Sequence, residues 1–366
     1  MKIPYVNIAV QHAQIKDEII NAVEKVIDSA QFILGSEVEE FEQRFAELCG
    51  VRFALGVNSG TDAIILALKS LNITSGDEVI TVPNSFVTTA SSIAFVGAKP
   101  VFVDVGEDYN INPEKIKERI NSNTRAILPV HLTGRPANMD AILEIAKHYG
   151  LFIIEDCAQA VRAEYKGKSV GSFGDIGCFS LHPLKTLNAC GDGGVLTTNS
   201  EETYKTLKIL RNNGLKSRDE CTFWSFNSRL DNIQAAILLV KLKYLNSWTE
   251  KRIENARFYQ ERLKNHPHIQ IPIDKPYERA VYHTFVIQTE GRNRLKEHLE
   301  QYGIGTNIHY PVPIHLQKPA REMGYKRGDF PVAERQAERI LSLPIYPELT
   351  IEELEYIVEH LYISYK

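Results

Sequence analysis

The chain has 366 residues, of which 43% are hydrophobic and 24% charged, with a formal net charge of −4 at pH 7. This length predicts two domains, or one large and one smaller domain, of ordinary globular composition. The slight acidic excess leaves no basic stripe for a phosphate backbone, so nucleic acid is not an expected partner. The longest apolar runs are too short to predict a membrane-spanning helix.

The N-terminal two-thirds of the sequence alternates short β-branched runs with helical patterns. The first predicted helix begins at Ser36-Glu37-Val38-Glu39, which has the pattern of a capping box, and runs to about Cys49. The alternation that follows predicts βαβ units around a mostly parallel sheet with helices on both faces. The predicted strands are residues 51–57, 78–82, 100–104, 125–130, 151–155 and 176–180, and the predicted helices are residues 61–71, 85–95, 113–120 and 139–149.

Beyond about residue 229 the pattern changes. Long helices of mixed charge are predicted over residues 230–245 and 247–263, and strands over residues 281–289 and 304–309, with a helix over residues 292–302 between the strands. A last helix is predicted over residues 351–361. We therefore expect a large α/β domain over residues 1–245, including N-terminal helices, and a smaller α+β domain over residues 246–366.

The five cysteines form no CxxC pair and have no metal-like spacing with histidine. The N-terminus carries no apolar signal core and no small-residue cleavage site. We expect free thiols in a reducing compartment, which indicates the cytoplasm, and no metal site.

Lys185 lies between an apolar strand that ends at Ser180 and a glycine-dense turn, Gly191-Asp192-Gly193-Gly194. A lysine at such a strand end can be partly desolvated, which lowers its pKa and favours the free amine that Schiff-base chemistry needs. Taken by itself, the lysine fits a solvated surface charge better than a functional role, because most lysines are solvated surface charges.

Asp156 ends a strand of the buried type, Leu151-Phe152-Ile153-Ile154-Glu155-Asp156. Open α/β sheets bind ligands at the carboxyl ends of their parallel strands. If the ligand is a cofactor with a pyridine ring, an aspartate there can pair with the protonated ring nitrogen and keep the ring an electron sink. Gln159, three residues on, is placed to reach a phenolic oxygen of the same cofactor. The alternative is that Asp156 only caps a helix.

The turn Asn58-Ser59-Gly60-Thr61-Asp62 joins a predicted strand to a predicted helix. Backbone N–H groups at a helix start, helped by small hydroxyls, form a phosphate cradle. Simple N-capping by Ser59 or Thr61 explains the same pattern.

In this order the motifs resemble the sugar aminotransferase family, the DegT–StrS group of fold-type-I pyridoxal-phosphate enzymes. The likeness is close from the N-terminus to about Asp231 and weaker beyond it. The stretches that carry it are Phe32-Ile33-Leu34-Gly35, Asn58 through Ala63, Gly76 through Ile80, Pro100 through Asp104, Pro129 through Gly134, Glu155 through Ala160, Gly171 through Lys185, Gly191 through Gly194, Asn227 through Asp231, Gly303 through Thr306 and His309 through Pro311.

The resemblance implies an α/β fold-type-I architecture and a pyridoxal 5′-phosphate cofactor. Lys185 is implied to form the Schiff base and to shuttle the proton, Asp156 to pair with the pyridinium nitrogen, and Gln159 to contact the ring oxygen. The implied phosphate ligands are Gly60, Thr61 and Ser180, next to Ser59.

The remaining implied roles concern the cofactor face, a second subunit and the substrate. Phe86 is implied to lie against the cofactor ring, and Asn227 to reach the phosphate of a neighbouring subunit, which predicts a homodimer with shared active sites. His309 and Tyr310 match substrate-contacting positions, although a packing role in a loop explains them equally well. Arg162 departs from the family's usual small residue, and it is either a surface charge or a contact to an anionic group of the substrate.

The activity implied by the resemblance is transfer of an amino group from L-glutamate to a keto sugar of the dTDP-, UDP- or GDP-linked kind, in the biosynthesis of amino sugars for surface glycans or antibiotics. Two alternatives stay open. One is a relative on the same scaffold that acts as a dehydratase or makes an aromatic amine, although the dehydratases carry histidine in place of Lys185. The other is a regulatory or binding protein on the same fold.

Overall fold

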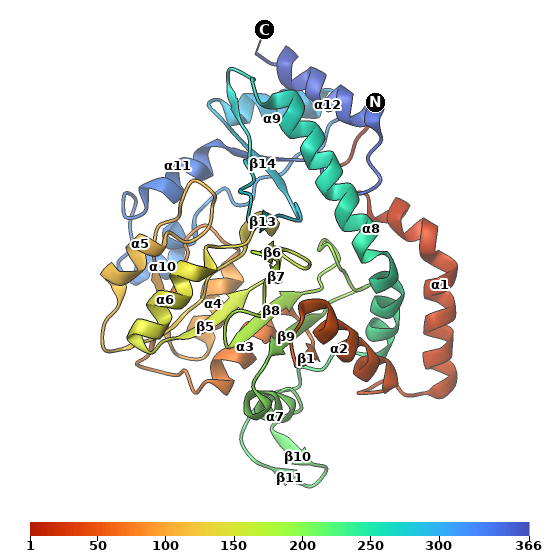
Figure 1. Cartoon of the computed structure of the whole chain (residues 1–366), viewed down its shortest axis with the longest axis vertical. Helices are drawn as coiled ribbons and strands as arrows, with labels where there is room; N and C mark the ends of the chain where they lie inside the picture. Colours follow the sequence, from red (N-terminus) through yellow and green to blue (C-terminus); the bar gives the residue numbers. More distant parts are fainter. Residues whose placement is uncertain (366) are drawn as a thin grey trace.

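The computed structural model describes residues 1–365, and a seven-stranded sheet forms its centre (Figure 1). The strand order is β1-β9-β8-β5-β4-β2-β3. Only the two pairs that involve β9 are antiparallel. The strands are β1 Phe53–Val57, β2 Glu78–Thr81, β3 Lys99–Phe102, β4 Thr124–Ile127, β5 Phe152–Asp156, β8 Ile176–Ser180 and β9 Gly194–Thr198. The expected α/β class with a mostly parallel sheet is confirmed.

Helices cover both faces of this sheet because its strands are apolar on both faces. In β8, Ile176 and Cys178 pack in the cluster that contains the helix α3, whereas Phe179 packs against Phe45 of α2, with ring centroids 5.0 Å apart. The helices are α1 Ile8–Ser29, α2 Ser36–Cys49, α3 Gly60–Ser70, α4 Val87–Phe95, α5 Pro113–Ile116, α6 Met139–Tyr149, α7 Glu201–Leu210, α8 Asn232–Leu263, α9 Arg292–Gln301, α10 Lys318–Glu322, α11 Pro331–Arg339 and α12 Ile351–Ile363. None of the helices in residues 1–365 has the length and apolar character needed to span a bilayer.

A second, smaller sheet lies in the C-terminal part, with the antiparallel order β12-β14-β15. It packs with α9, α12 and the end of α8 around one apolar cluster. The remaining strands are β6 Glu164–Tyr165, β7 Lys168–Ser169, β10 Leu215–Ser217, β11 Glu220–Cys221, β12 Ile269–Gln270, β13 Glu278–Arg279, β14 Phe285–Thr289 and β15 Ile340–Leu343, and the short 3-10 turns are η1 Lys117–Arg119, η2 Leu132–Gly134 and η3 Ile314–Leu316.

The two helices predicted over residues 230–263 are one helix, α8, which lies beside α1 and reaches from the large sheet to the C-terminal cluster (Figure 1). The polar pair Asn246-Ser247 does not interrupt it, and the Ser247 hydroxyl donates to the carbonyl of Tyr244 (2.8 Å) within the helix. The predicted boundary at residue 245 falls inside α8, and the division into two domains stays a prediction.

Two local predictions were wrong. The capping box at Ser36 does not form; the Asn232 side chain of α8 accepts from the N–H of Val38 (3.1 Å) and caps α2 from outside. Residues 304–309 do not form a strand, since they make only isolated bridges, from Ile304 to Ile3 and from Asn307 to Ser342.

Candidate active site

The carboxyl ends of β1, β2, β5 and β8 meet at one edge of the large sheet, where they surround a cavity of about 350 Å³. Parallel strands present their carboxyl ends on the same side, so segments far apart in the sequence come together here. The lining residues that the sequence singled out are Ser59, Gly60, Thr61, Phe86, Asp156, Gln159, Ser180, Lys185, His309 and Tyr310.

Lys185 extends into this cavity from the loop that follows β8. Its backbone N–H donates to the carbonyl of His182 (2.8 Å), which fixes the start of a turn. The amine has no hydrogen-bond or ion-pair partner among residues 1–365. Burial lowers the pKa of Lys185 to about 8, against the opposing effect of the Asp156 charge. The amine therefore loses its proton near pH 8, well below the pH at which an ordinary lysine does.

A second lysine supports the loop that carries Lys185. Lys241 of α8 is fully buried, and its amine donates to the backbone and side-chain oxygens of Asn188 (2.9 and 2.6 Å). It also lies 2.8 Å from Nε2 of His12 in α1. The Asn188 side chain in turn donates to the carbonyl of Lys185 (2.9 Å). These bonds tie the loop to the long helix behind it.

Asp156 lies at the end of β5 and is only 4% exposed. Its carboxylate accepts from the N–H of Ala158 (3.1 Å) and from the hydroxyl of Thr89 (2.8 Å). Burial raises the pKa of Asp156, and these two bonds together with the positive charge of Lys185 only partly offset the effect. A cationic partner in the cavity would therefore stabilise the ionised carboxylate.

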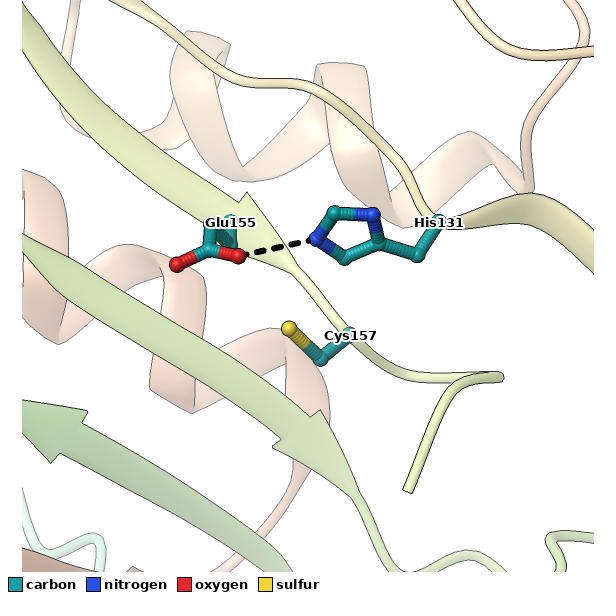
Figure 2. Close-up of side chains that lie close together, drawn as sticks. All are labelled: His131, Glu155 and Cys157. Atoms are coloured by element: carbon teal, nitrogen blue, oxygen red, sulfur yellow. Dashed lines mark hydrogen bonds and ion pairs between the residues drawn. The ribbon is translucent and has the colours of Figure 1, made fainter. Parts of the chain in front are cut away.

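The neighbouring Glu155 points to the opposite side of β5 and forms a buried group with His131 and Cys157 (Figure 2). His131 Nε2 lies 3.0 Å from the carboxylate of Glu155, while Nδ1 accepts from the N–H of Ala137 (3.0 Å). The Glu155 oxygens also accept from three backbone N–H groups, of Gly171, Phe173 and Gly174, each at 2.8 Å. Because both imidazole nitrogens and both carboxylate oxygens already have partners in the chain, this group is a support behind Asp156.

The turn after β1 forms a narrow cradle. Ser59 is the N-cap of α3, with its hydroxyl accepting from the N–H of Asp62 (3.1 Å). The N-capping explanation is therefore confirmed for Ser59. At position 60, a Cβ atom would lie 2.7 Å from Cβ of Ser180, so only glycine leaves this space open. Gly60 and Thr61 begin α3 and line the same cavity, and the first turn of a helix suits an anion.

An aromatic wall faces the cradle. Phe86 is 50% exposed although it is a large apolar residue, and its ring lies 5.6 Å from that of Tyr310. The Gln159 amide donates to the Tyr310 hydroxyl (3.3 Å) and accepts from the N–H of Thr133 (2.7 Å). His309 Nδ1 lies 2.9 Å from the Ser342 hydroxyl. These bonds orient polar and aromatic groups around one open space.

A profile of the DegT/DnrJ/EryC1/StrS aminotransferase family matches residues 13–362. The chain belongs to this family. It is 40% identical to a pleiotropic regulatory protein of Geobacillus stearothermophilus, with 98% of this chain and 97% of the relative covered. It is 42% identical to UDP-N-acetyl-3-dehydro-alpha-D-glucosamine 3-aminotransferase of Acidithiobacillus ferrooxidans, over 96% and 95% of the two chains. It is also 42% identical to dTDP-3-amino-3,6-dideoxy-alpha-D-galactopyranose transaminase of Aneurinibacillus thermoaerophilus, over 98% of each.

Solved structures from the DegT family have the same fold over the whole chain. DesV of S. venezuelae, in complex with a ketimine intermediate, superposes with a TM-score of 0.97 at 38% identity, over 99% of this chain and 98% of DesV. NtdA of Bacillus subtilis, with bound cofactor PMP, has a TM-score of 0.93 at 31% identity, over 99% of this chain and 85% of NtdA. The cofactor of the DegT family is pyridoxal 5′-phosphate.

The cavity of this DegT-family chain has the groups that such a cofactor needs. It offers an unpartnered amine on Lys185 for the aldehyde, a buried carboxylate on Asp156 for the ring nitrogen and the half-exposed face of Phe86 for the ring. The cradle at Gly60 has room for a phosphate because no Cβ fills it. These residue types fit pyridoxal 5′-phosphate as a set.

Two residues singled out from the sequence do not line this chain's own cavity. The Arg162 guanidinium donates to the side-chain oxygen of Asn246 (2.7 Å) in α8, so the structure gives its predicted substrate contact no support. Asn227 is exposed and bridges to Asn212. An exposed position away from the chain's own cavity is compatible with a role toward a second subunit, and that role stays a prediction.

The cavity is also lined by residues that the sequence did not single out, among them the polar side chains of Tyr5, Arg252 and His283. They come from the N-terminal segment, the middle of α8 and the segment before β14. None lies at the end of a strand in the large sheet, which was the signal that identified Asp156 and Lys185. Tertiary packing alone brings them to the DegT-family site.

Proposed function

We propose that this protein is an aminotransferase that moves an amino group from L-glutamate to a keto sugar linked to a nucleotide. The observation that supports it most directly is that the unpartnered amine of Lys185 and the buried carboxylate of Asp156 face one cavity of cofactor size. When bound, the cofactor supplies an electron sink for the carbanion at the substrate carbon that loses its proton.

The chain's own residues do the remaining work. Lys185 would hold the aldehyde of the cofactor, and its freed amine would take the proton from the donor's α-carbon and return a proton on the acceptor side. Asp156 would pair with the ring nitrogen of the cofactor and stabilise its protonated form. Gly60, Thr61 and Ser180, with Ser59 capping the helix behind them, hold the phosphate at the start of α3.

The side walls of the cavity fix the ring and exclude water. Phe86 would lie against the bound cofactor ring, and Gln159, whose amide is held by Tyr310 and Thr133, would contact the phenolic oxygen of the ring. His309 and Tyr310 bound the space where a sugar enters.

The names of the relatives suggest the position of the new amine. Both relatives that are 42% identical are named for a sugar with an amino or keto group at carbon 3, one on UDP and one on dTDP. We therefore extend the proposal to amination at carbon 3 of a nucleotide-linked 3-keto sugar. A panel of 3-keto and 4-keto sugars, offered to the aminated cofactor form and analysed by mass spectrometry, decides between these positions.

The assembly and location remain predictions. We propose a homodimer in which Asn227 of each chain completes the phosphate site of the other, in the cytoplasm. Analytical ultracentrifugation tests the dimer, and Asn227→Ala should weaken cofactor binding only if the site is shared.

The regulatory alternative is suggested by one relative's name, pleiotropic regulatory protein. A regulator that does no chemistry does not require Lys185 and Asp156 together, yet both face the cavity. The dehydratase alternative is disfavoured because lysine, not histidine, stands at position 185.

The direct test adds L-glutamate to the purified protein with its cofactor and follows the absorption spectrum. The band of the lysine-bound cofactor should fall as that of the aminated form rises, with release of 2-oxoglutarate. A spectrum that does not change, with cofactor demonstrably bound, contradicts the proposed function.

A further inference from the structure

Arg252 lies in the middle of α8, is only 8% exposed and lines the same cavity as Lys185. Its Nη1 donates to the backbone carbonyls of Ile345 and Tyr282. Its Nε and Nη2 make no hydrogen bond within residues 1–365. Part of a buried, charged fork is thus directed at the cavity without an acceptor.

The other buried arginines are paired differently. Arg135 lies 2.9 Å from the carboxylate of Asp274, and Arg211 is bonded to Glu42. For Arg252, by contrast, no carboxylate oxygen within the described chain lies as close as 4.0 Å. The nearest acidic influence is Glu348, and burial raises the pKa of that carboxyl group. A buried cation with no close counter-ion is costly, and an anion that enters the cavity would offset that cost.

His283 adds a second polar group without a partner. Its Nδ1 is buried and makes no hydrogen bond to any of residues 1–365, and its ring lines the cavity. Burial, followed by the positive charges of Lys185 and Arg252, lowers the pKa of His283 well below its usual value. The neutral ring can donate one hydrogen bond to an anion that Arg252 holds.

We propose that Arg252, with His283 beside it, binds the α-carboxylate of the amino donor and of the 2-oxo acid that leaves. This inference rests on the proposed transamination. A guanidinium matches a carboxylate with two parallel bonds. The α-carboxylate is attached to the very carbon from which Lys185 takes the proton, so one cavity that holds both Arg252 and Lys185 suits it.

The test compares the cofactor-loaded protein with Arg252→Lys and Arg252→Met. Binding of 2-oxoglutarate to the lysine-bound form is measured by calorimetry, because this form has no amine to transfer and no reaction follows. Arg252→Met should weaken binding roughly 10- to 100-fold, and Arg252→Lys by less, since it keeps the charge without the fork. Arg262→Met is the matched control, an exposed arginine of the same helix, and should change nothing.

The two half-reactions, measured separately, show which anionic group Arg252 binds. The KM for L-glutamate should rise in Arg252→Met while the KM for the keto sugar stays constant. If only the KM for the keto sugar rises, Arg252 binds the nucleotide phosphates, and this result overturns the proposal. The proposal is also overturned if the native protein transfers the amine but Arg252→Lys and Arg252→Met bind the donor as tightly as the native protein does. Binding of 2-oxoglutarate through Arg252 without any amine transfer would instead contradict the proposed function alone.

The spectrum of the bound cofactor and far-UV circular dichroism report whether each variant folds. If Arg252→Met does not fold, His283→Gln carries the same test, because His283 gives up no hydrogen bond within residues 1–365. This variant should weaken 2-oxoglutarate binding several-fold, because one hydrogen bond to the ligand is lost. An unchanged affinity in that variant overturns the proposal.

Discussion

Replacing Glu155 with glutamine tests whether the buried carboxylate behind Asp156 supports the site. Burial raises the pKa of Glu155, but the bonds from His131 and from backbone N–H groups outweigh it, and the net direction is down. His131 also donates its backbone N–H to the carbonyl of Asp156 (3.0 Å). A displaced His131 would therefore move the strand end that carries Asp156.

The size of the effect follows from the donors around Glu155. Each carboxylate oxygen accepts two hydrogen bonds, and in glutamine one of these oxygens becomes an NH₂ group that meets two donors. His131 cannot relieve the conflict by changing its tautomer, because its Nδ1 is already the acceptor for Ala137. Two lost bonds to a charged group cost about 3–6 kcal/mol in total, a large share of ordinary protein stability.

Thermal unfolding of the cofactor-loaded protein measures this loss. Glu155→Gln should lower the midpoint by on the order of 5–10 °C and weaken cofactor binding. Glu144→Gln, an exposed glutamate of α6, is the control and should have no effect. The folded-state pKa of Glu155 is lowered, so the stabilisation by its ionised carboxylate is fully present above the unfolded-state pKa. This stabilisation is lost as the pH falls through the folded-state pKa. The difference in midpoint between the native protein and Glu155→Gln should therefore narrow in acid. Equal midpoints at neutral pH refute the reasoning.

Three other outcomes concern the cofactor cavity. Attachment of pyridoxal 5′-phosphate to the cofactor-free protein needs the neutral amine of Lys185, so its rate should rise with pH through a midpoint near 8; a midpoint near the ordinary lysine value of 10.5 contradicts the burial argument. Gly60→Ala puts a Cβ 2.7 Å from that of Ser180 and should weaken cofactor affinity by about tenfold, measured by equilibrium dialysis; an unchanged affinity would show that the cradle lies elsewhere. Lys241→Met should cost about 1–3 kcal/mol in unfolding experiments, because buried acceptors lose their donor. The exposed Lys243→Met in the same helix should cost nearly nothing, and equal losses in the two variants would argue against the support that Lys241 gives the loop.

The large sheet and the positions of Asp156 and Lys185 were predictable because the sequence patterns that indicate them are local. The apolar run that ends at Asp156 identifies both β5 and a polar residue at its carboxyl end. The same holds for β8, which leads to Lys185. Once the sheet is parallel, these two ends must share an edge, and their meeting in one cavity needs no further information.

Other elements were beyond local reasoning. Only Gln11, Ile15 and Val26 are buried along the 22 residues of α1, so its apolar stripe is too thin to predict a packed helix. In α8, two helices were predicted where there is one, which packs along its length against α1, α2 and the C-terminal cluster. Arg252 has no sequence motif around it, because its place in the cavity depends on how α8 crosses the fold.

The capping of α2 illustrates the same limit. Ser36 has the right residue type and spacing for a capping box, but a side chain from α8, Asn232, takes the N–H of Val38. A partner 194 residues away in the chain outcompetes the local one, and no window of sequence reveals this.

Borohydride reduction of the cofactor-loaded protein, followed by peptide mass spectrometry, is the most direct measurement of the central assignment. It fixes the cofactor to whichever lysine holds it. Two lysines with lowered pKa values lie close together, Lys185 on the loop after β8 and Lys241 on α8 behind that loop. We predict the cofactor mass on the peptide that contains Lys185 and none on the peptide that contains Lys241. Labelling of Lys241, or of any other lysine in place of Lys185, would contradict the account.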